Sequence, residues 1–165
     1  MEEEFAELHE VPLSVTSQPL SEQAVSLIRE GRAIIPQVNC FDFVPSKYEV
    51  AWNVLAALPR GRLCEWGSGL GIVVGLAELL GHTAFGVEID ANLADTSRSL
   101  LRSHGLQSPI ETGSYMELHT EADYYYVYSW PSQFAAVQQR FQSISPSHAC
   151  LLLCYGHDDI RCLKK

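Results

Sequence analysis

The chain has 165 residues, 47% of them hydrophobic, and a formal net charge of −9. This length indicates one domain with enough apolar side chains for a sizeable core. The acidic balance argues against nucleic acid as a partner, because nucleic-acid-binding domains normally carry a basic stripe. The longest apolar runs, such as residues 149–155, are far shorter than the roughly 18 residues of a membrane-spanning helix.

Residues 1–40 are predicted to form an N-terminal arm and a helix that pack on the main domain, residues 41–165. The first 20 residues mix acidic residues with prolines, which indicates a loosely attached arm. Ser21 is placed to cap a helix that has an apolar stripe, and Gly31 is expected to end it. We expect this helix to pack on the sheet.

The next segment, residues 33–46, contains two prolines and is predicted to be an ordered loop. Ser46 is a good helix N-cap, and Glu49 three residues later would close a capping box. A helix over residues 47–58 follows, with its apolar side chains on one face.

The most informative stretch is a strand–turn–helix–strand unit. Residues 62–66 read as a short buried strand, and residues 65–71 follow the pattern acid-x-Gly-x-Gly-x-Gly. An apolar helix is predicted from residue 72 to residue 80, with Gly81 as its stop. A second strand, residues 83–87, ends in the acid Glu88. This arrangement is typical of a nucleotide-binding βαβ unit.

The spacing of the glycines and acids narrows the range of ligands that this unit could bind. Glycines let the chain turn tightly and let a ligand touch the main chain, and Glu88 is placed where an acid accepts from ribose hydroxyls. The third glycine, Gly71, comes one residue too early for the dinucleotide pattern. A carboxylate at Glu65 would repel a pyrophosphate, but it suits a cation such as the amino group of S-adenosylmethionine (SAM).

Two segments carry a resemblance to a known family. Residues 65–71 and 86–90 resemble motif I and the second-strand acid of class I SAM-dependent methyltransferases, over roughly residues 41–160. Residues 43–46, Phe-Val-Pro-Ser, are similar to a segment of the short protein lysine methyltransferases. That group includes archaeal enzymes and the mitochondrial enzymes acting on ATP synthase c-subunit and adenine nucleotide translocase. Leu70 stands where these enzymes usually carry Asp.

The resemblance implies a cofactor site for SAM, with S-adenosylhomocysteine (SAH) as product. It implies that Glu65 and the glycine turn hold the methionine part, that Glu88 holds the ribose and that Ile89 lies against the adenine. It also implies cofactor contacts at these further positions: Phe43, Ser46, Gly67, Ser68, Gly69, Gly71, Ser114 and Ser129. For Phe43 and Ser46, capping and packing are the alternative roles. Ser114 is the position matching a polar contact to the adenine amino group.

Further along the chain, Asp90 is predicted to cap a helix that runs to about His104, followed by a short strand at residues 110–112. Residues 123–128 are strongly β-prone. Because the ends of strands one and four flank the switch point of a doubly wound sheet, Tyr128, Ser129 and Trp130 would face the methyl group and the acceptor. Tyr128 and Trp130 are the candidate catalytic residues, able to hold an ammonium group by cation–π contact. A Trp-Pro corner packed on the sheet is the alternative.

The last predicted elements are a helix over residues 134–141 and a strand over residues 149–155, buried on both faces. A loop histidine, His157, follows and is expected to be solvated. The predicted fold is therefore α/β, a three-layer αβα Rossmann-like sandwich with about five parallel strands. Their order by resemblance is 3-2-1-4-5, and the fold is truncated at its C-terminus. An edge left open beyond the fifth strand would suit a partner subunit, as in a homo-oligomer.

The cysteines and the N-terminal residues indicate in which cellular compartment the protein is expected. The five cysteines are an odd number without a C-x-x-C pair, which indicates thiols in a reducing compartment and no zinc site. The start, Met-Glu-Glu-Glu, is unlike the basic start of a signal peptide. We expect a cytoplasmic protein.

These observations predict a SAM-dependent methyltransferase acting on a nitrogen acceptor. The sequence offers no clear catalytic base, which a hydroxyl acceptor would need. A protein lysine is the favoured acceptor, and a small molecule stays open. The alternative is a SAM-binding or protein-interaction module without turnover. An NAD-dependent oxidoreductase is disfavoured by the glycine spacing.

Overall fold

The computed structural model describes residues 7–38, 46–156 and 158–165. Its centre is a seven-stranded sheet in the order β1-β7-β6-β5-β2-β3-β4. The strands are β1 (His9–Val11), β2 (Arg62–Trp66), β3 (Thr83–Glu88), β4 (Ile110–Thr112), β5 (Tyr124–Tyr128), β6 (Cys150–Cys154) and β7 (Ile160–Lys164). Five neighbouring strands of this sheet are parallel, in the order β4, β3, β2, β5 and β6. Their order is the predicted one.

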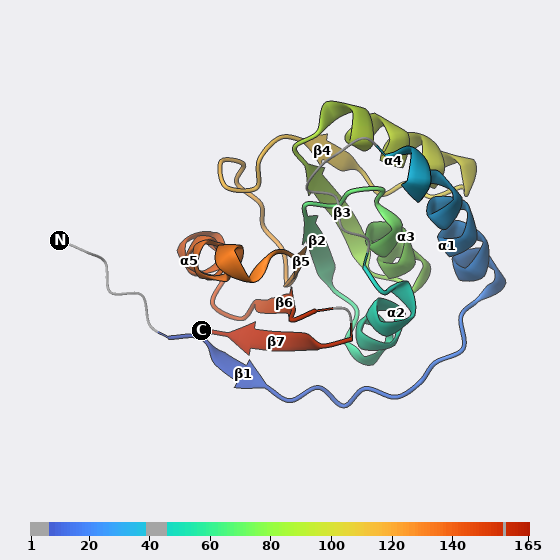
Figure 1. The fold of residues 1–165 in the computed structure, drawn as a ribbon. Coiled ribbons are helices and arrows are strands. Elements are labelled where there is room, and N and C mark those ends of the chain that lie inside the picture. The colour runs from blue at the N-terminus through green and yellow to red at the C-terminus, as the bar shows by residue number, and fades with distance from the viewer. Residues whose placement is uncertain (1–6, 39–45, 157) are drawn as a thin grey trace.

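Helices cover the two faces of the sheet unequally (Figure 1). One face carries α1 (Glu22–Ile34), α2 (Tyr48–Ala57), α3 (Ile72–Leu79) and α4 (Ala91–Ser103), and it holds the larger apolar cluster. The other face carries α5 (Phe134–Ile144), which packs Val137 and Phe141 on the sheet. Short 3-10 turns follow α1 (Ile35–Gln37) and precede α5 (Pro131–Gln133). This is the three-layer α/β class expected from the sequence.

The sheet edge beyond β6 is not open, which corrects the prediction of an uncovered edge after the fifth strand. After β6 the chain turns at Gly156, whose φ is +92°, and returns as β7 antiparallel to β6. β1 then pairs antiparallel with β7, opposing His9 to Lys164. Residues 9–11, expected in a loose arm, therefore form the edge strand. Because β7 and β1 use the backbone groups of this edge, a partner subunit is not needed to cover it.

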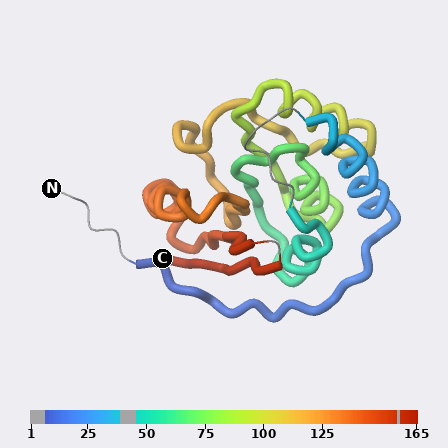
Figure 2. Tube along the Cα trace, in the orientation of Figure 1, coloured from blue at the N-terminus to red at the C-terminus, as the bar shows by residue number. Residues whose placement is uncertain are grey.

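The segment between β1 and α1 runs along the outside of the molecule (Figure 2). It is fixed to α2 near its end, where the Trp52 indole N–H donates to the Pro19 carbonyl at 3.3 Å and the Gln18 N–H donates to Asn53 Oδ1 at 2.9 Å. In the described part of the chain, no helix combines the length and apolar character needed to cross a membrane.

Two helix caps are as predicted and one is not. Ser21 and Asp90 each accept a hydrogen bond from the backbone N–H three residues later, at 3.1 and 2.8 Å. The predicted capping box on α2 is wrong. Lys47 is the N-cap and makes no side-chain cap bond, and Glu49 instead accepts twice from Arg32, at 2.9 Å each. A strong charge-assisted pair between α1 and α2 replaces the local cap.

The predicted end of α1 at Gly31 is also wrong, since the helix continues to Ile34. Gly31 is buried against α3, and a Cβ atom there would overlap Ile72 Cδ1. Glycine at this position therefore serves the close approach of two helices rather than a helix stop.

Replacing Gly31 by valine is expected to lower the free energy of unfolding by about 1–3 kcal/mol, because the added side chain must push α1 away from Ile72. Urea denaturation measures this loss. Arg29→Val, at an exposed position on the same helix, is the matched control for the helix cost of a β-branched residue. Equal losses in the two variants would contradict the packing role of Gly31.

Candidate functional site

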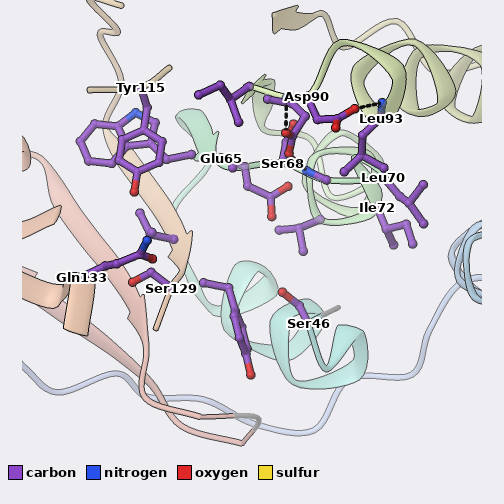
Figure 3. A pocket seen from close by; sticks show the side chains of 18 of the residues that line it. Ser46, Glu65, Ser68, Leu70, Ile72, Asp90, Leu93, Tyr115, Ser129 and Gln133 are labelled. Carbon is purple, nitrogen blue, oxygen red and sulfur yellow. Dashed lines mark hydrogen bonds between the residues drawn. The ribbon is translucent and has the colours of Figure 1, made fainter. Parts of the chain in front are cut away.

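A cavity of about 520 Å³ opens at the carboxyl ends of β2, β3 and β5 (Figure 3). This edge is where parallel α/β sheets bind ligands. The cavity is lined by Ser46, Tyr48, Glu65, Trp66, Gly67, Ser68, Gly69, Leu70, Ile72, Val73, Glu88, Ile89, Asp90, Leu93, Tyr115, Val127, Tyr128, Ser129, Trp130 and Gln133. Most of the sequence-predicted site residues are therefore brought together in one place.

The glycine turn between β2 and α3 forms the floor of the cavity. Gly67, Gly69 and Gly71 have φ values of +70°, +57° and +74°, which other residues rarely adopt. The N–H groups of Gly67 and Ser68 both donate to the Val87 carbonyl, at 2.8 and 2.9 Å. The turn is thus anchored to β3 and leaves main-chain atoms open to a ligand.

Glu88, at the end of β3, fixes the rim of this turn. Its Oε1 accepts from the Gly69 N–H at 2.9 Å, and its Oε2 accepts from the Asp90 N–H at 2.8 Å. Each carboxylate oxygen has a further lone pair for a ligand hydroxyl. The next residue, Ile89, also lines the cavity, and 72% of its surface is exposed.

Glu65, at the end of β2, points into the middle of the cavity (Figure 3). It is only 4% exposed, and its Oε1 has no hydrogen-bond partner. Burial raises the pKa of Glu65 well above its usual value, the charge of Glu88 raises it further, and the Val74 N–H opposes both. Two other buried oxygens among the described residues lack a partner, Ser68 Oγ and Ser129 Oγ, and both residues line this cavity.

The charge of the lining has one sign. Three carboxylates, those of Glu65, Glu88 and Asp90, contribute to it, and no lysine, arginine or histidine is among the described residues that line it. A cavity of this kind favours a ligand with cationic groups and disfavours a pyrophosphate.

One wall comes from the loop between β4 and β5, where no helix forms. The Tyr115 ring stacks on Trp66, with ring centroids 4.9 Å apart and planes 4° apart. Arg140 of α5 donates to the Tyr115 carbonyl at 2.9 Å and to the Leu118 carbonyl at 2.8 Å. The Trp66 indole N–H donates to Thr120 Oγ1 at 3.1 Å. Side chains of β2 and α5 therefore fix the loop that presents Tyr115.

The opposite wall carries the residues expected to face an acceptor. Tyr128 and Ser129 are partly buried, and Trp130 is 51% exposed at the mouth. Gln133 lies beside Ser129 (Figure 3), and its Oε1 accepts from the Trp130 N–H at 3.4 Å.

Three predicted positions are not among the lining residues. Gly71 does not line the cavity, and a Cβ atom there would face Leu101 and Ser97 instead. Ser114 does not line the cavity, and its hydroxyl accepts from the Met116 N–H at 3.2 Å instead. Phe43 lies outside the described residues. Ser46 does line the cavity, where its hydroxyl accepts from the Tyr126 hydroxyl at 3.4 Å.

Sequence reasoning missed several lining residues. The principal ones are Tyr48, Asp90, Leu93, Tyr115 and Gln133. Tyr115 was next to the predicted Ser114, but nothing local indicates which of the two side chains faces the cavity. Tyr48 and Gln133 reach it from segments whose position depends on long-range packing.

No protein-family model and no curated protein matches this chain. Solved structures do match its fold. A methyltransferase from Podospora anserina with SAH bound aligns at a TM-score of 0.63 and 15% identity, over 84% of this chain and 64% of that one. An O-methyltransferase from Bacillus cereus in complex with SAH aligns at 0.62 and 14%, over 82% and 66%.

An RNA methyltransferase from Salinibacter ruber in complex with SAH aligns at a TM-score of 0.54 and 18% identity, over 82% of this chain and 76% of that one. The chain spans only 46% and 58% of two other matched structures, from Pyrococcus horikoshii and Lactobacillus delbrueckii. At these identities the likeness establishes the Rossmann-like fold of class I methyltransferases.

Proposed function

We propose that this protein is a SAM-dependent methyltransferase that transfers a methyl group to a nitrogen acceptor, a protein lysine being the favoured one. The observation that carries this proposal is the carboxylate-lined cavity at the switch point of the sheet, whose lining residues include no basic side chain. SAM brings two cationic groups, a sulfonium and an ammonium, which such a lining attracts. A dinucleotide brings a pyrophosphate, which the same lining repels.

The residues present fit this cofactor. Glu65 Oε1 and Ser68 Oγ are buried without partners and would take the methionine end together with the glycine turn. Glu88 retains lone pairs for the ribose hydroxyls, and exposed Ile89 offers an apolar surface to the adenine. Phe43 and Ser114 remain predictions for the cofactor contact, and Ser114 has no support from the cavity lining.

When bound, SAM supplies a methyl group that its sulfonium already activates. The chain then has to align an acceptor and exclude water from it. Tyr128, Ser129 and Trp130, which line the same cavity as Glu65, are the side chains that we propose for this role. The aromatic rings would hold an ammonium or amine by contacts worth roughly 0.5–2 kcal/mol, and Ser129 Oγ has a free hydrogen-bonding position.

The phenols in the cavity do not supply the base that a hydroxyl acceptor would need. Burial raises the pKa of Tyr48 and of Tyr128 above the ordinary value of tyrosine. Both phenols therefore stay protonated at neutral pH and do not act as bases. A lysine amine attacks without a base once it has lost its proton to solvent, whereas a hydroxyl needs a base to take its proton during the attack. The net charge of −9 further favours a basic acceptor.

Isothermal calorimetry with SAM, SAH and NAD tests the cofactor assignment. We expect micromolar binding of SAM and SAH and none of NAD. Transfer of a labelled methyl group to lysine-containing peptides or proteins then tests the reaction. Binding without any transfer would favour the SAM-binding module without turnover, and no binding of SAM or SAH would refute the proposed function.

A further inference from the structure

Glu65 has an unusual environment for a carboxyl group. It is almost fully enclosed by protein, it lines the cavity, and its buried Oε1 has no hydrogen-bond partner among the described residues. A buried carboxylate normally has a cation or several donors, because an unpaired buried charge costs several kcal/mol. Only the backbone N–H of Val74, from α3, favours the charged form of Glu65.

The titratable groups that interact electrostatically with Glu65 come from α2 and from four strands of the sheet. They are Tyr48 of α2, Cys64 of β2, Glu88 of β3, Tyr126 of β5 and Cys154 of β6. None of them is a cation. The nearest charged group named here, Glu88, is itself a carboxylate that two backbone N–H groups hold in place.

Burial, the lack of a hydrogen-bond partner for Oε1 and the neighbouring Glu88 all favour the protonated form of Glu65 in the free protein. Ionisation would place a second negative charge near Glu88 in a site that offers no compensating cation. An ammonium group delivered by a ligand changes this balance, because it pairs with the carboxylate where no cation among the described residues does.

We propose that Glu65 selects its ligand by charge and by proton exchange: the free protein keeps the carboxyl group neutral, and the ammonium of SAM or SAH replaces its proton, which leaves to solvent. This inference rests on the proposed function, since it names the role of Glu65 within that site. No bond other than the O–H bond of the carboxyl group breaks.

The direction of the pH dependence follows. Ammonium binding requires the carboxylate, so below the pKa of Glu65 in the free protein the affinity for SAH falls towards tenfold per pH unit, about 1.4 kcal/mol. The affinity therefore rises with pH until Glu65 ionises without a ligand. Glu65→Gln stays neutral at every pH and should bind SAH weakly, with little change over the pH range in which the affinity of wild type rises.

The stability of the free protein should move in the opposite direction. The pKa of Glu65 is raised on folding, so the stability linked to this group is fully present below its unfolded pKa. This contribution to the free energy of unfolding is lost as the pH rises through the pKa of Glu65 in the folded protein. The free energy of unfolding of wild type should therefore fall relative to that of Glu65→Gln as the pH rises above about 5. SAH should offset this loss in wild type.

Calorimetry of SAH binding in two buffers of different ionisation enthalpy measures the protons released. We expect wild type to release up to one proton at a pH below the pKa of Glu65 in the free protein, and Glu65→Gln to release none. Glu10→Gln, the same change at an exposed position on β1, should release as many as wild type. Urea denaturation of wild type and Glu65→Gln across the same pH range provides a readout that needs no ligand.

SAH binding by wild type without proton release, or equal release by Glu65→Gln, would overturn this inference and leave the proposed function standing. Failure of wild type to bind SAH at any pH would instead refute the proposed function itself. A pH-dependent loss of stability in wild type that is absent from Glu65→Gln supports the proton on Glu65 in either case.

Discussion

Replacing Trp66 by alanine is expected to lower the free energy of unfolding by about 3–5 kcal/mol, the range for truncating a large buried aromatic side chain. Trp66 has no exposed surface. It stacks on Tyr115 at 4.9 Å and tilts against Tyr125 at 5.0 Å. On this face of the sheet, α5 is the one helix among the described residues, so few side chains can move in to fill the hole.

The effect should extend beyond packing. The Trp66 indole holds the 113–122 loop through Thr120 Oγ1 at 3.1 Å, and the Thr120 side chain is itself buried. Trp66→Phe keeps much of the apolar contact but leaves the buried hydroxyl without its donor, at a cost of about 1–3 kcal/mol. It should therefore recover only part of the loss.

Urea denaturation followed by circular dichroism measures these differences as shifts in midpoint at constant slope. Trp130→Ala is the matched control, since 51% of that side chain is exposed. It should cost less than about 1 kcal/mol. A Trp66→Ala variant as stable as Trp130→Ala would contradict the role given to Trp66.

Replacing Glu88 by alanine is expected to weaken SAH binding by about a hundredfold or more. The carboxylate accepts from the Gly69 N–H and the Asp90 N–H, both within 2.9 Å. Hydrogen bonds to charged groups contribute about 1.5–3 kcal/mol each, and 1.4 kcal/mol corresponds to tenfold in affinity. The variant loses the fixed shape of the glycine turn together with the acceptor proposed for the ribose.

Isothermal calorimetry with SAH measures the change. Glu111→Ala is the matched control, because Glu111 lies opposite Val87 on β4 and is exposed outside this cavity. It should bind as wild type does. Glu88→Gln should fall between the two, since its amide oxygen can replace one carboxylate oxygen. Affinity of Glu88→Ala equal to wild type would remove Glu88 from the binding site.

Much of the fold was predictable because its signals are local. The turn needed glycines at Gly67, Gly69 and Gly71 because the backbone there has positive φ. The apolar runs of β5 and β6 indicated buried parallel strands, and both pair in parallel within the sheet. Ser21 and Asp90 cap their helices through bonds that span three residues.

The errors occurred where contacts between distant segments outweighed local signals. Gly31 was expected to end its helix, but it is needed because the side chain of Ile72 leaves no room for a Cβ atom there. Glu49 was expected to cap its own helix, but it pairs with Arg32 of α1. Pairing of β7 with β6 and of β1 with β7 joins opposite ends of the chain, and no local period reveals such pairing.

The same division holds for the site. The glycine turn and the two acids, Glu65 and Glu88, could be predicted from local sequence, because they lie at the ends of two recognisable strands. Tyr48 and Tyr115 reach the cavity because distant segments of the chain pack together. The same packing leaves no basic side chain among the described residues that line it. The lack of a hydrogen-bond partner for Glu65 Oε1 also results from tertiary packing, because α2, α3 and four strands together surround this carboxyl group.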